Sequence, residues 1–296
     1  MLEKLETETR NRKTMALDQM STREFLQVMN EEDQRVPQAI QSQLPQIEMA
    51  VHQVMESFRN QGRLIYTGAG TSGRLGILDA VECVPTFSAS PEMVRGIIAG
   101  GLKALTDAVE GAEDDEELGK TDLARLQLSE RDTVIGLAAS GRTPYVIGAL
   151  AYAKSQGAST VSISCNKGSE MSAYSDIAIE VETGPEVLTG STRLKAGSAQ
   201  KMVLNMISTA AMVGIGKVYQ NLMVDVQPTN NKLKERSKRI IMEATNVDYQ
   251  TASTYFAKAD QQVKTAIVML LLDCSKKEAI EKIKGSHGFV RKALSD

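Results

Sequence analysis

The sequence predicts an α/β protein built on a doubly wound, five-stranded parallel sheet, with N-terminal helices and a small C-terminal helical domain. Short Val- and Ile-rich runs between residues 63 and 182 alternate with helical stretches, which is the order of parallel strands joined by helical crossovers. These runs are continuously rich in Val and Ile rather than alternating, as in parallel strands that helices cover on both faces. Strand-like runs end before residue 231, so a separate helical domain is expected to follow.

The N-terminal region has a helical pattern from Ser21 to about Arg59. Ser21 and Glu24 stand three residues apart, as in a capping box, and apolar residues then recur at intervals of three and four. Gly62 ends this pattern. We therefore expect an N-terminal helical segment over residues 1–55, an α/β domain over 56–231 and a C-terminal helical domain over 232–296.

The α/β domain is expected to alternate strands with helices. Strands are expected at 63–68, 93–99, 132–140, 159–165 and 175–182. Helices are expected at 71–84, where Pro85 follows, at 114–128, and at 143–157, with Pro144 in the first turn and Gly157 at the end. A long helix within 191–219 has apolar or small residues around much of its circumference, which favours burial in the protein or in a subunit interface.

The C-terminal domain is expected to contain short helices only. Four helical stretches follow one another, at 232–245, 248–259, 261–274 and 275–285. The apolar run at 266–272 is far too short to span a membrane.

Composition excludes several classes of function. The formal net charge of −3, the absence of Trp and an aromatic content of 4% give no reason to expect nucleic acid or an anionic membrane as partner. Three well-separated cysteines and two histidines do not suggest a metal site. The N-terminus lacks a secretory apolar region. We expect a soluble, cytoplasmic protein that uses no metal.

A glycine-rich motif follows the first strand. Gly68, Gly70 and Gly73 match the G-x-G-x-x-G fingerprint of dinucleotide-binding turns. That fingerprint needs an acidic residue at the end of the second strand to hold a ribose, and this strand ends in "IIAGG" instead. A dinucleotide is therefore disfavoured.

A second Ser-Gly-Arg turn repeats the first one. "TSGR" at 71–74 and "ASGR" at 139–142 each stand between a strand and a helix, where backbone N–H groups and the helix dipole favour an anion. We interpret the pair as a site for a phosphate monoester, with generic turn residues as the alternative. The binding residues would be Thr71, Ser72, Gly73, Ser140, Gly141, Arg142 and Thr143.

Two acids and one polar loop complete the candidate residues. Glu82 and Glu113 each have an ordinary interpretation from sequence alone, as an exposed helix residue and as part of an acidic helix start. The loop at 184–197 faces either a substrate or merely the start of a helix. Its polar residues are Glu186, Ser191, Thr192, Arg193 and Lys195.

Three long motifs together resemble the N-acetylmuramic acid 6-phosphate etherases, a family with a sugar isomerase (SIS) domain that is related to the glucokinase regulatory protein. The motifs are "IYTGAGTSGRLGILDAVECVPTF", "AASGRTPYV" and "GPEVLTGSTRLKAGSAQKMVLNMIST". The resemblance implies cleavage of the D-lactyl ether of N-acetylmuramic acid 6-phosphate to N-acetylglucosamine 6-phosphate and D-lactate, in cell-wall sugar recycling. It also implies a homodimer with the site near its interface.

The resemblance assigns the two acids a catalytic role. It makes Glu82, in the "AVE" segment, the proton donor, and Glu113, in the "EGAED" segment, the second catalytic acid, with no cofactor. Four basic residues are candidates for the lactyl carboxylate: Arg74, Arg142, Arg193 and Lys195. The alternatives are an aldose–ketose isomerase on the same fold and a non-catalytic sugar-phosphate sensor.

Overall fold

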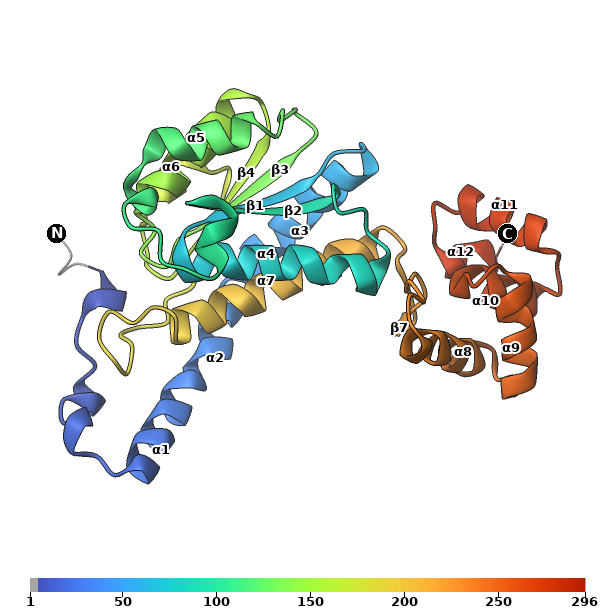
Figure 1. The fold of residues 1–296 in the computed structure, drawn as a ribbon, viewed down its shortest axis with the longest axis horizontal. Coiled ribbons are helices and arrows are strands. Elements are labelled where there is room, and N and C mark those ends of the chain that lie inside the picture. Colours follow the sequence, from blue (N-terminus) through green and yellow to red (C-terminus); the bar gives the residue numbers. More distant parts are fainter. Residues whose placement is uncertain (1–4, 296) are drawn as a thin grey trace. The chain divides into compact units, whose positions relative to one another are not determined.

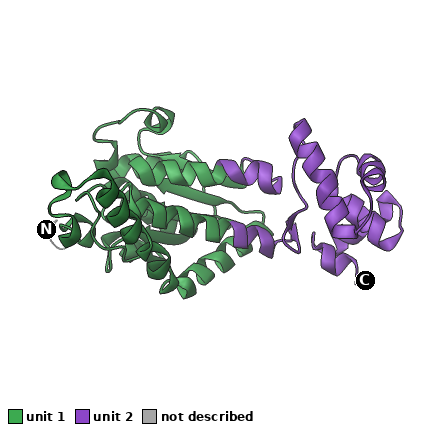
Figure 2. Ribbon diagram, turned by 90° about the horizontal axis from the view of Figure 1, so that it is seen from below, with its two compact units in different colours: residues 1–80, 92–208 green, residues 81–91, 209–296 purple. Residues whose placement is uncertain are grey.

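The computed structural model of the chain describes residues 5–295, which form two compact units. The first unit contains residues up to 80 together with 92–208, and the second contains 81–91 together with 209–295 (Figure 2). The boundaries expected near residues 55 and 231 are a different division and stay predictions.

The first unit is a parallel sheet with helices on both faces (Figure 1). Its strands are β1 (Leu64–Gly68), β2 (Val94–Ile98), β3 (Thr133–Leu137), β4 (Ser159–Ser164) and β5 (Ile177–Glu180). They are ordered β2-β1-β3-β4-β5, and every pair is parallel. All residues of β1 and β3 are buried, which explains why apolar residues predominate in both strands without alternating with charged ones. The predicted fold class is confirmed.

Within residues 5–295, three N-terminal α-helices and four further α-helices accompany the sheet. The N-terminal helices are α1 (Thr22–Asp33), α2 (Arg35–Gln41) and α3 (Leu44–Arg59). Ser21 and Glu24 form the expected capping box at the start of α1. The crossover and following helices are α4 (Gly70–Phe87), α5 (Glu116–Ala124), α6 (Pro144–Ser155) and α7 (Lys195–Gly214).

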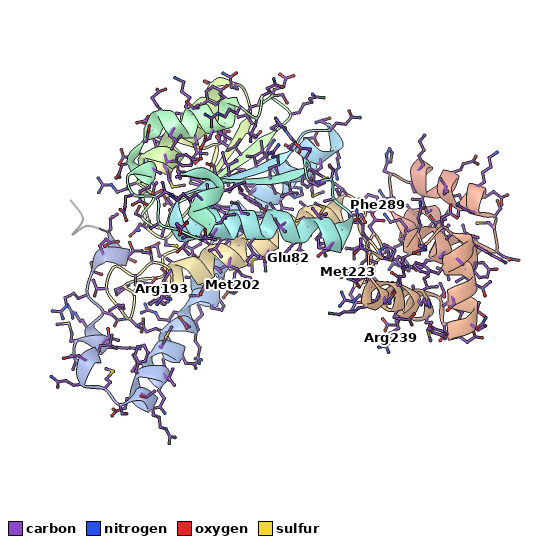
Figure 3. The ribbon with its side chains drawn as sticks, in the orientation of Figure 1. Glu82, Arg193, Met202, Met223, Arg239 and Phe289 are labelled. Carbon is purple, nitrogen blue, oxygen red and sulfur yellow. The ribbon has the colours of Figure 1, made fainter. Side chains whose placement is uncertain are left out.

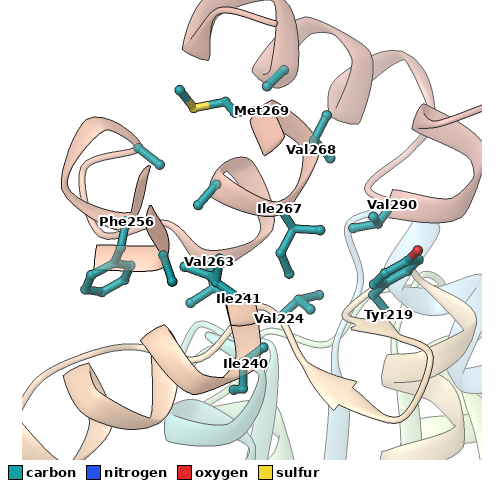
Figure 4. Packing of buried hydrophobic residues seen from close by; sticks show 14 of the residues in the cluster. Tyr219, Val224, Ile240, Ile241, Phe256, Val263, Ile267, Val268, Met269 and Val290 are labelled. Carbon is teal, nitrogen blue, oxygen red and sulfur yellow. The ribbon is translucent and has the colours of Figure 1, made fainter. Parts of the chain in front are cut away.

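The second unit has its own apolar core (Figure 4). Its elements are the hairpin β6 (Val218–Tyr219) and β7 (Leu222–Met223), and the helices α8 (Asn231–Thr245), α9 (Tyr249–Lys258), α10 (Val263–Leu272), α11 (Lys276–Gly285) and α12 (Val290–Ala293). Ile241, Ile267 and Val268 are fully buried at its centre. Among the described residues, no helix combines the length and the apolarity needed to cross a bilayer.

Two local expectations were wrong. Helix α4 continues through Pro85 to Phe87, because a proline in the last turn removes only one backbone hydrogen bond. Residues 218 and 219, expected to lie in the helix over 191–219, instead form β6 of the β6–β7 hairpin, because α7 stops at Gly214.

Candidate active site

The two Ser-Gly-Arg segments follow the neighbouring strands β1 and β3, at the point where the strand order of the sheet reverses. From β1 the chain crosses through α4 to β2, and from β3 it crosses through α6 to β4 on the other side. Gly68, the last residue of β1, is paired with Leu137, the last residue of β3. The two following loops therefore leave the sheet side by side, at the position where open α/β sheets bind ligands.

The first segment is the opening turn of α4. Gly70 has a φ of +51°, a left-handed conformation that favours glycine, and starts the helix. A Cβ at Gly73 would lie 2.6 Å from the carbonyl oxygen of Gly68, so only glycine lets the helix approach the strand this closely. Thr71 is half-buried, and Ser72 is buried with its hydroxyl donating to Oε1 of Gln200 at 2.7 Å.

The second segment is a loop held in place by the chain after β4. Gly141 has a φ of +70°, and a Cβ there would lie 2.3 Å from Cβ of Ser169. The Met171 N–H donates to the carbonyl of Gly141 at 2.9 Å. Ser140, Arg142 and Thr143 are half-buried, so their polar groups reach the surface of the loop.

Thr143 is the N-cap residue of α6, yet its hydroxyl does not cap the helix. The Ser140 hydroxyl accepts a hydrogen bond from the Arg142 N–H at 3.3 Å, which leaves the hydroxyl proton available. Arg142 Nε lies 3.5 Å from a carboxylate oxygen of Glu170. Two hydroxyls at a helix N-terminus suit an anion that accepts hydrogen bonds.

Glu113 lines a small cavity next to the first segment. It lies in a 3-10 turn (Ala112–Asp114) and is exposed. The cavity has a volume of about 160 Å³, and Gly70 and Arg74 also line it. Arg74 donates to the carbonyls of Leu105 at 3.2 Å and Asp107 at 3.3 Å, which holds the wall of the cavity.

Glu82 lies in the C-terminal part of α4 and its side chain is exposed (Figure 3). Its residue number places it in the second compact unit, whereas Glu113 belongs to the first.

The loop at 184–197 is organised around the start of α7. Glu186 is fully buried, and its carboxylate accepts hydrogen bonds from the N–H groups of Lys195 and Ala196, each at 3.0 Å. Burial raises the pKa of Glu186, and the two N–H bonds oppose that rise. Glu186 thus caps the helix, the alternative that the sequence left open.

The side chain of Lys195 is held within this same region. Its ammonium lies 2.7 Å from Oε2 of Glu32, and both side chains are fully buried. Ser191 and Thr192 are half-buried, and Arg193 is exposed near the start of α7 (Figure 3). Arg193 makes no hydrogen bond or ion pair with any described residue.

Two family models match overlapping parts of the chain. The glucokinase regulatory protein N-terminal SIS domain matches residues 46–154, and the SIS domain matches residues 104–210. Together they cover the sheet and the loops described above.

Full-length relatives decide the family. An N-acetylmuramic acid 6-phosphate etherase of Shouchella clausii is 67% identical over 294 residues, covering 99% of each chain. One from a Geobacillus species is 68% identical over 294 residues, covering 99% of this chain and all of the relative. The chain belongs to the N-acetylmuramic acid 6-phosphate etherase family.

Solved structures confirm the fold of this etherase-family chain. A phosphoheptose isomerase from Francisella tularensis is 14% identical, with a TM-score of 0.52, and covers 66% of this chain and 100% of its own. Phosphoheptose isomerase from Neisseria gonorrhoeae is 16% identical, with a TM-score of 0.50, and covers 64% and 98%. At this identity the likeness concerns the fold alone.

The sequence of this etherase-family chain did not single out the buried partners of the site. Gln200 holds Ser72, Glu32 holds Lys195, and Asp79 accepts hydrogen bonds from Tyr66 at 2.8 Å and Ser208 at 3.1 Å. The pKa of Asp79 lies above its ordinary value because the side chain is buried, and the two hydrogen bonds only partly offset this rise. An isolated polar residue within an apolar helical stretch, such as Asp79 between Leu78 and Ala80, was the available signal.

Metal-binding clusters are absent from residues 5–295: no group of three or more His, Cys, Asp or Glu side chains is placed to hold an ion. His52 is exposed on α3, 3.8 Å from Glu48. His287 has a φ of +51° at the turn after α11.

Proposed function

We propose that this protein cleaves the D-lactyl ether of N-acetylmuramic acid 6-phosphate in the cytoplasm, giving N-acetylglucosamine 6-phosphate and D-lactate. The observation that carries the proposal is the 67% identity to a relative named for this reaction over 99% of both chains. The paired hydroxyl-bearing segments after β1 and β3 support it, because they suit a phosphate monoester.

The elimination needs two proton transfers, the addition of water needs two more, and neither stage is a redox step. In the open-chain sugar the C1 aldehyde acidifies the proton on C2. A base removes that proton, the C2–C3 double bond forms, and the C3–O bond breaks as an acid protonates the leaving lactate oxygen. Water then adds across the double bond, with its oxygen on C3 and a proton on C2. Each positioned proton transfer contributes about 10²–10⁴-fold to the rate.

Glu82 serves as the acid toward the lactate oxygen, and Glu113 as the base at C2. The position of Glu113 in the cavity beside Gly70 and Arg74 supports its role, because that cavity adjoins the phosphate segment. The phosphate lies against Ser140, Gly141 and Thr143, with Ser72 close by.

Arg193 binds the lactyl carboxylate. Arg74 is bonded to two backbone carbonyls, Arg142 lies beside Glu170, and Lys195 is buried against Glu32. Arg193 is exposed at the start of α7 and makes no ion pair within residues 5–295. Its guanidinium is therefore the available cation for a bidentate carboxylate contact.

Two copies of the chain complete one site. Within the uninterrupted helix α4, Glu82 follows Gly70 by twelve residues, which is about 18 Å along the helix axis. A single hexose phosphate held at the first turn of α4 is too short to reach that far along the same helix. Glu82 of one copy therefore serves the phosphate segments of another, in a homodimer.

One assay separates this function from the two alternatives. The protein is incubated with N-acetylmuramic acid 6-phosphate, and D-lactate is measured enzymatically. Release of D-lactate supports the etherase. Formation of a ketose without lactate would instead support an aldose–ketose isomerase, and binding without turnover would support a sensor.

A further inference from the structure

The hydroxyl proton of Ser72 is directed at Gln200. Ser72 lies in the first turn of α4, is 8% exposed, and donates to Oε1 of Gln200 at 2.7 Å. A serine hydroxyl has a single proton, so its oxygen then offers only lone pairs to a ligand. An ionised phosphate also offers only lone pairs. In this arrangement Ser72 cannot donate to a phosphate.

The side-chain amide of Gln200 can reverse the direction of its hydrogen bond with Ser72. Gln200 lies on α7 and is 1% exposed, and its Nε2 has no hydrogen-bond partner within residues 5–295. A half-turn of the carboxamide places Nε2 where Oε1 stands, so that Nε2 donates to Ser72 Oγ. The half-turn breaks no N–H hydrogen bond, and the terminal torsion of glutamine is soft. The Ser72 proton is then free.

Close packing of α7 against α4 brings these two side chains together. Gly197 stands one turn before Gln200, and a Cβ there would lie 3.5 Å from Cγ2 of Thr71. The start of α7 is fixed by the Glu186 carboxylate, which holds the N–H groups of residues 195 and 196. Gln200 is thus presented to Ser72 from a rigid helix.

We propose that Gln200 is a positioning residue that sets the direction of the Ser72 hydroxyl and thereby the affinity for the substrate phosphate. The inference rests on the proposed function for the identity of the ligand. With the carboxamide turned, Nε2 donates to Ser72 Oγ and the Ser72 proton goes to a phosphate oxygen. Gln200 itself does not touch the substrate.

A double-mutant cycle tests this relay, with N-acetylglucosamine 6-phosphate as the probe and calorimetry to measure Kd. In Gln200→Glu the new carboxylate can only accept hydrogen bonds, so it keeps the Ser72 proton directed at itself. The Kd for the sugar phosphate should therefore rise about tenfold or more. Gln200→Met, of similar size, removes the orienting donor and should raise Kd by a smaller factor. Circular dichroism checks that each variant is folded. If Gln200→Glu does not fold, Gln200→Met alone is enough for the cycle.

Making the Gln200 variants in two serine mutants separates an effect through the Ser72 hydroxyl from a purely structural effect. In a Ser72→Ala background, Gln200→Met should leave Kd unchanged, and the effect of Gln200→Glu should shrink. In a Ser140→Ala background, Gln200→Met should keep its full effect, because Gln200 is bonded to Ser72 and not to Ser140. Equal fold-changes in the Ser72→Ala and wild-type backgrounds overturn the proposal.

The proposed function fails in a different way. If the wild type binds N-acetylglucosamine 6-phosphate but releases no D-lactate from the etherase substrate, the reaction assignment is wrong and the cycle still decides the role of Gln200. If the wild type does not bind the sugar phosphate at all, both proposals are overturned.

Discussion

Glu32 and Lys195 form an ion pair of 2.7 Å in which both side chains are fully buried. The pair joins the end of α1 to the start of α7, two elements separated by more than 160 residues of chain. Glu32 also accepts from Asn11 at 3.1 Å and lies within 3.4 Å of Lys13 and Arg35. Lys195 has Glu32 as its one ion-pair partner among the described residues.

Glu32→Gln should destabilise the protein more than Lys195→Met does. The first change leaves a buried ammonium without its counter-ion, which typically costs about 3–5 kcal/mol. The second leaves Glu32 with three other partners and should cost about 1–3 kcal/mol. Urea unfolding measures both. Equal losses would show that Lys13, Arg35 and Asn11 do not support the Glu32 charge.

The same pair should make stability depend on pH in the acid range. Although burial raises the pKa of Glu32, hydrogen bonds from Lys195 and Lys13 lower it from 4.5 to about 2. Because the pKa of Glu32 is lower in the folded than in the unfolded state, its ionised form stabilises the folded state. This contribution is complete above the unfolded-state pKa and is lost as the pH falls toward about 2. The free energy of unfolding of the wild type should fall more steeply between pH 4.5 and 2 than that of Glu32→Gln. Parallel curves for the two proteins would refute the assignment.

Ser140→Ala should weaken substrate binding without stopping the reaction. The Ser140 hydroxyl keeps its proton free for a phosphate oxygen, and a hydrogen bond to a charged group is worth about a tenfold change in affinity. KM should rise by about that factor while kcat changes little. Ser155→Ala is the matched control, because that exposed serine ends α6, where its hydroxyl donates to the Tyr152 carbonyl and accepts from the neighbouring Gln156 side chain. An unchanged KM in Ser140→Ala would place the phosphate elsewhere.

Glu82→Gln should slow lactate release strongly and spare binding. The substitution removes the proton donor to the leaving oxygen, so kcat should fall about 10²–10⁴-fold. The Kd for N-acetylglucosamine 6-phosphate should stay close to that of the wild type. Glu117→Gln, another exposed acid, on α5, is the control and should leave kcat unchanged. A Glu82→Gln protein that is folded but no longer binds the sugar would count against an acid role.

The sheet was predictable because its signals are local. Each strand is a short apolar run, and the capping box at Ser21 and the prolines and glycines around α6 mark helix ends within a few residues. The doubled Ser-Gly-Arg segment was also visible, and the sheet topology brings its two copies to one edge. Strands of two residues, such as β6 and β7, are too short to leave such a pattern.

The buried partners of the site were not predictable, because they depend on contacts between distant segments. Ser72 and Gln200 are 128 residues apart, and Glu32 and Lys195 are 163 residues apart. Lys195 has the sequence context of a substrate-binding cation, and only the fold shows that its charge is held by a helix from the N-terminal region. Helix α4 passes through Pro85 because a proline in the last turn removes only one backbone hydrogen bond, so the residue type alone did not fix where the helix ends.

The central claim is that the ether is broken by elimination followed by addition of water to the sugar. The most direct test is incubation with N-acetylmuramic acid 6-phosphate in H₂¹⁸O, with mass spectrometry of both products. The account predicts D-lactate without label and N-acetylglucosamine 6-phosphate with one ¹⁸O on C3. Label in the lactate, with none on C3, would mean displacement at the lactyl carbon and would contradict it.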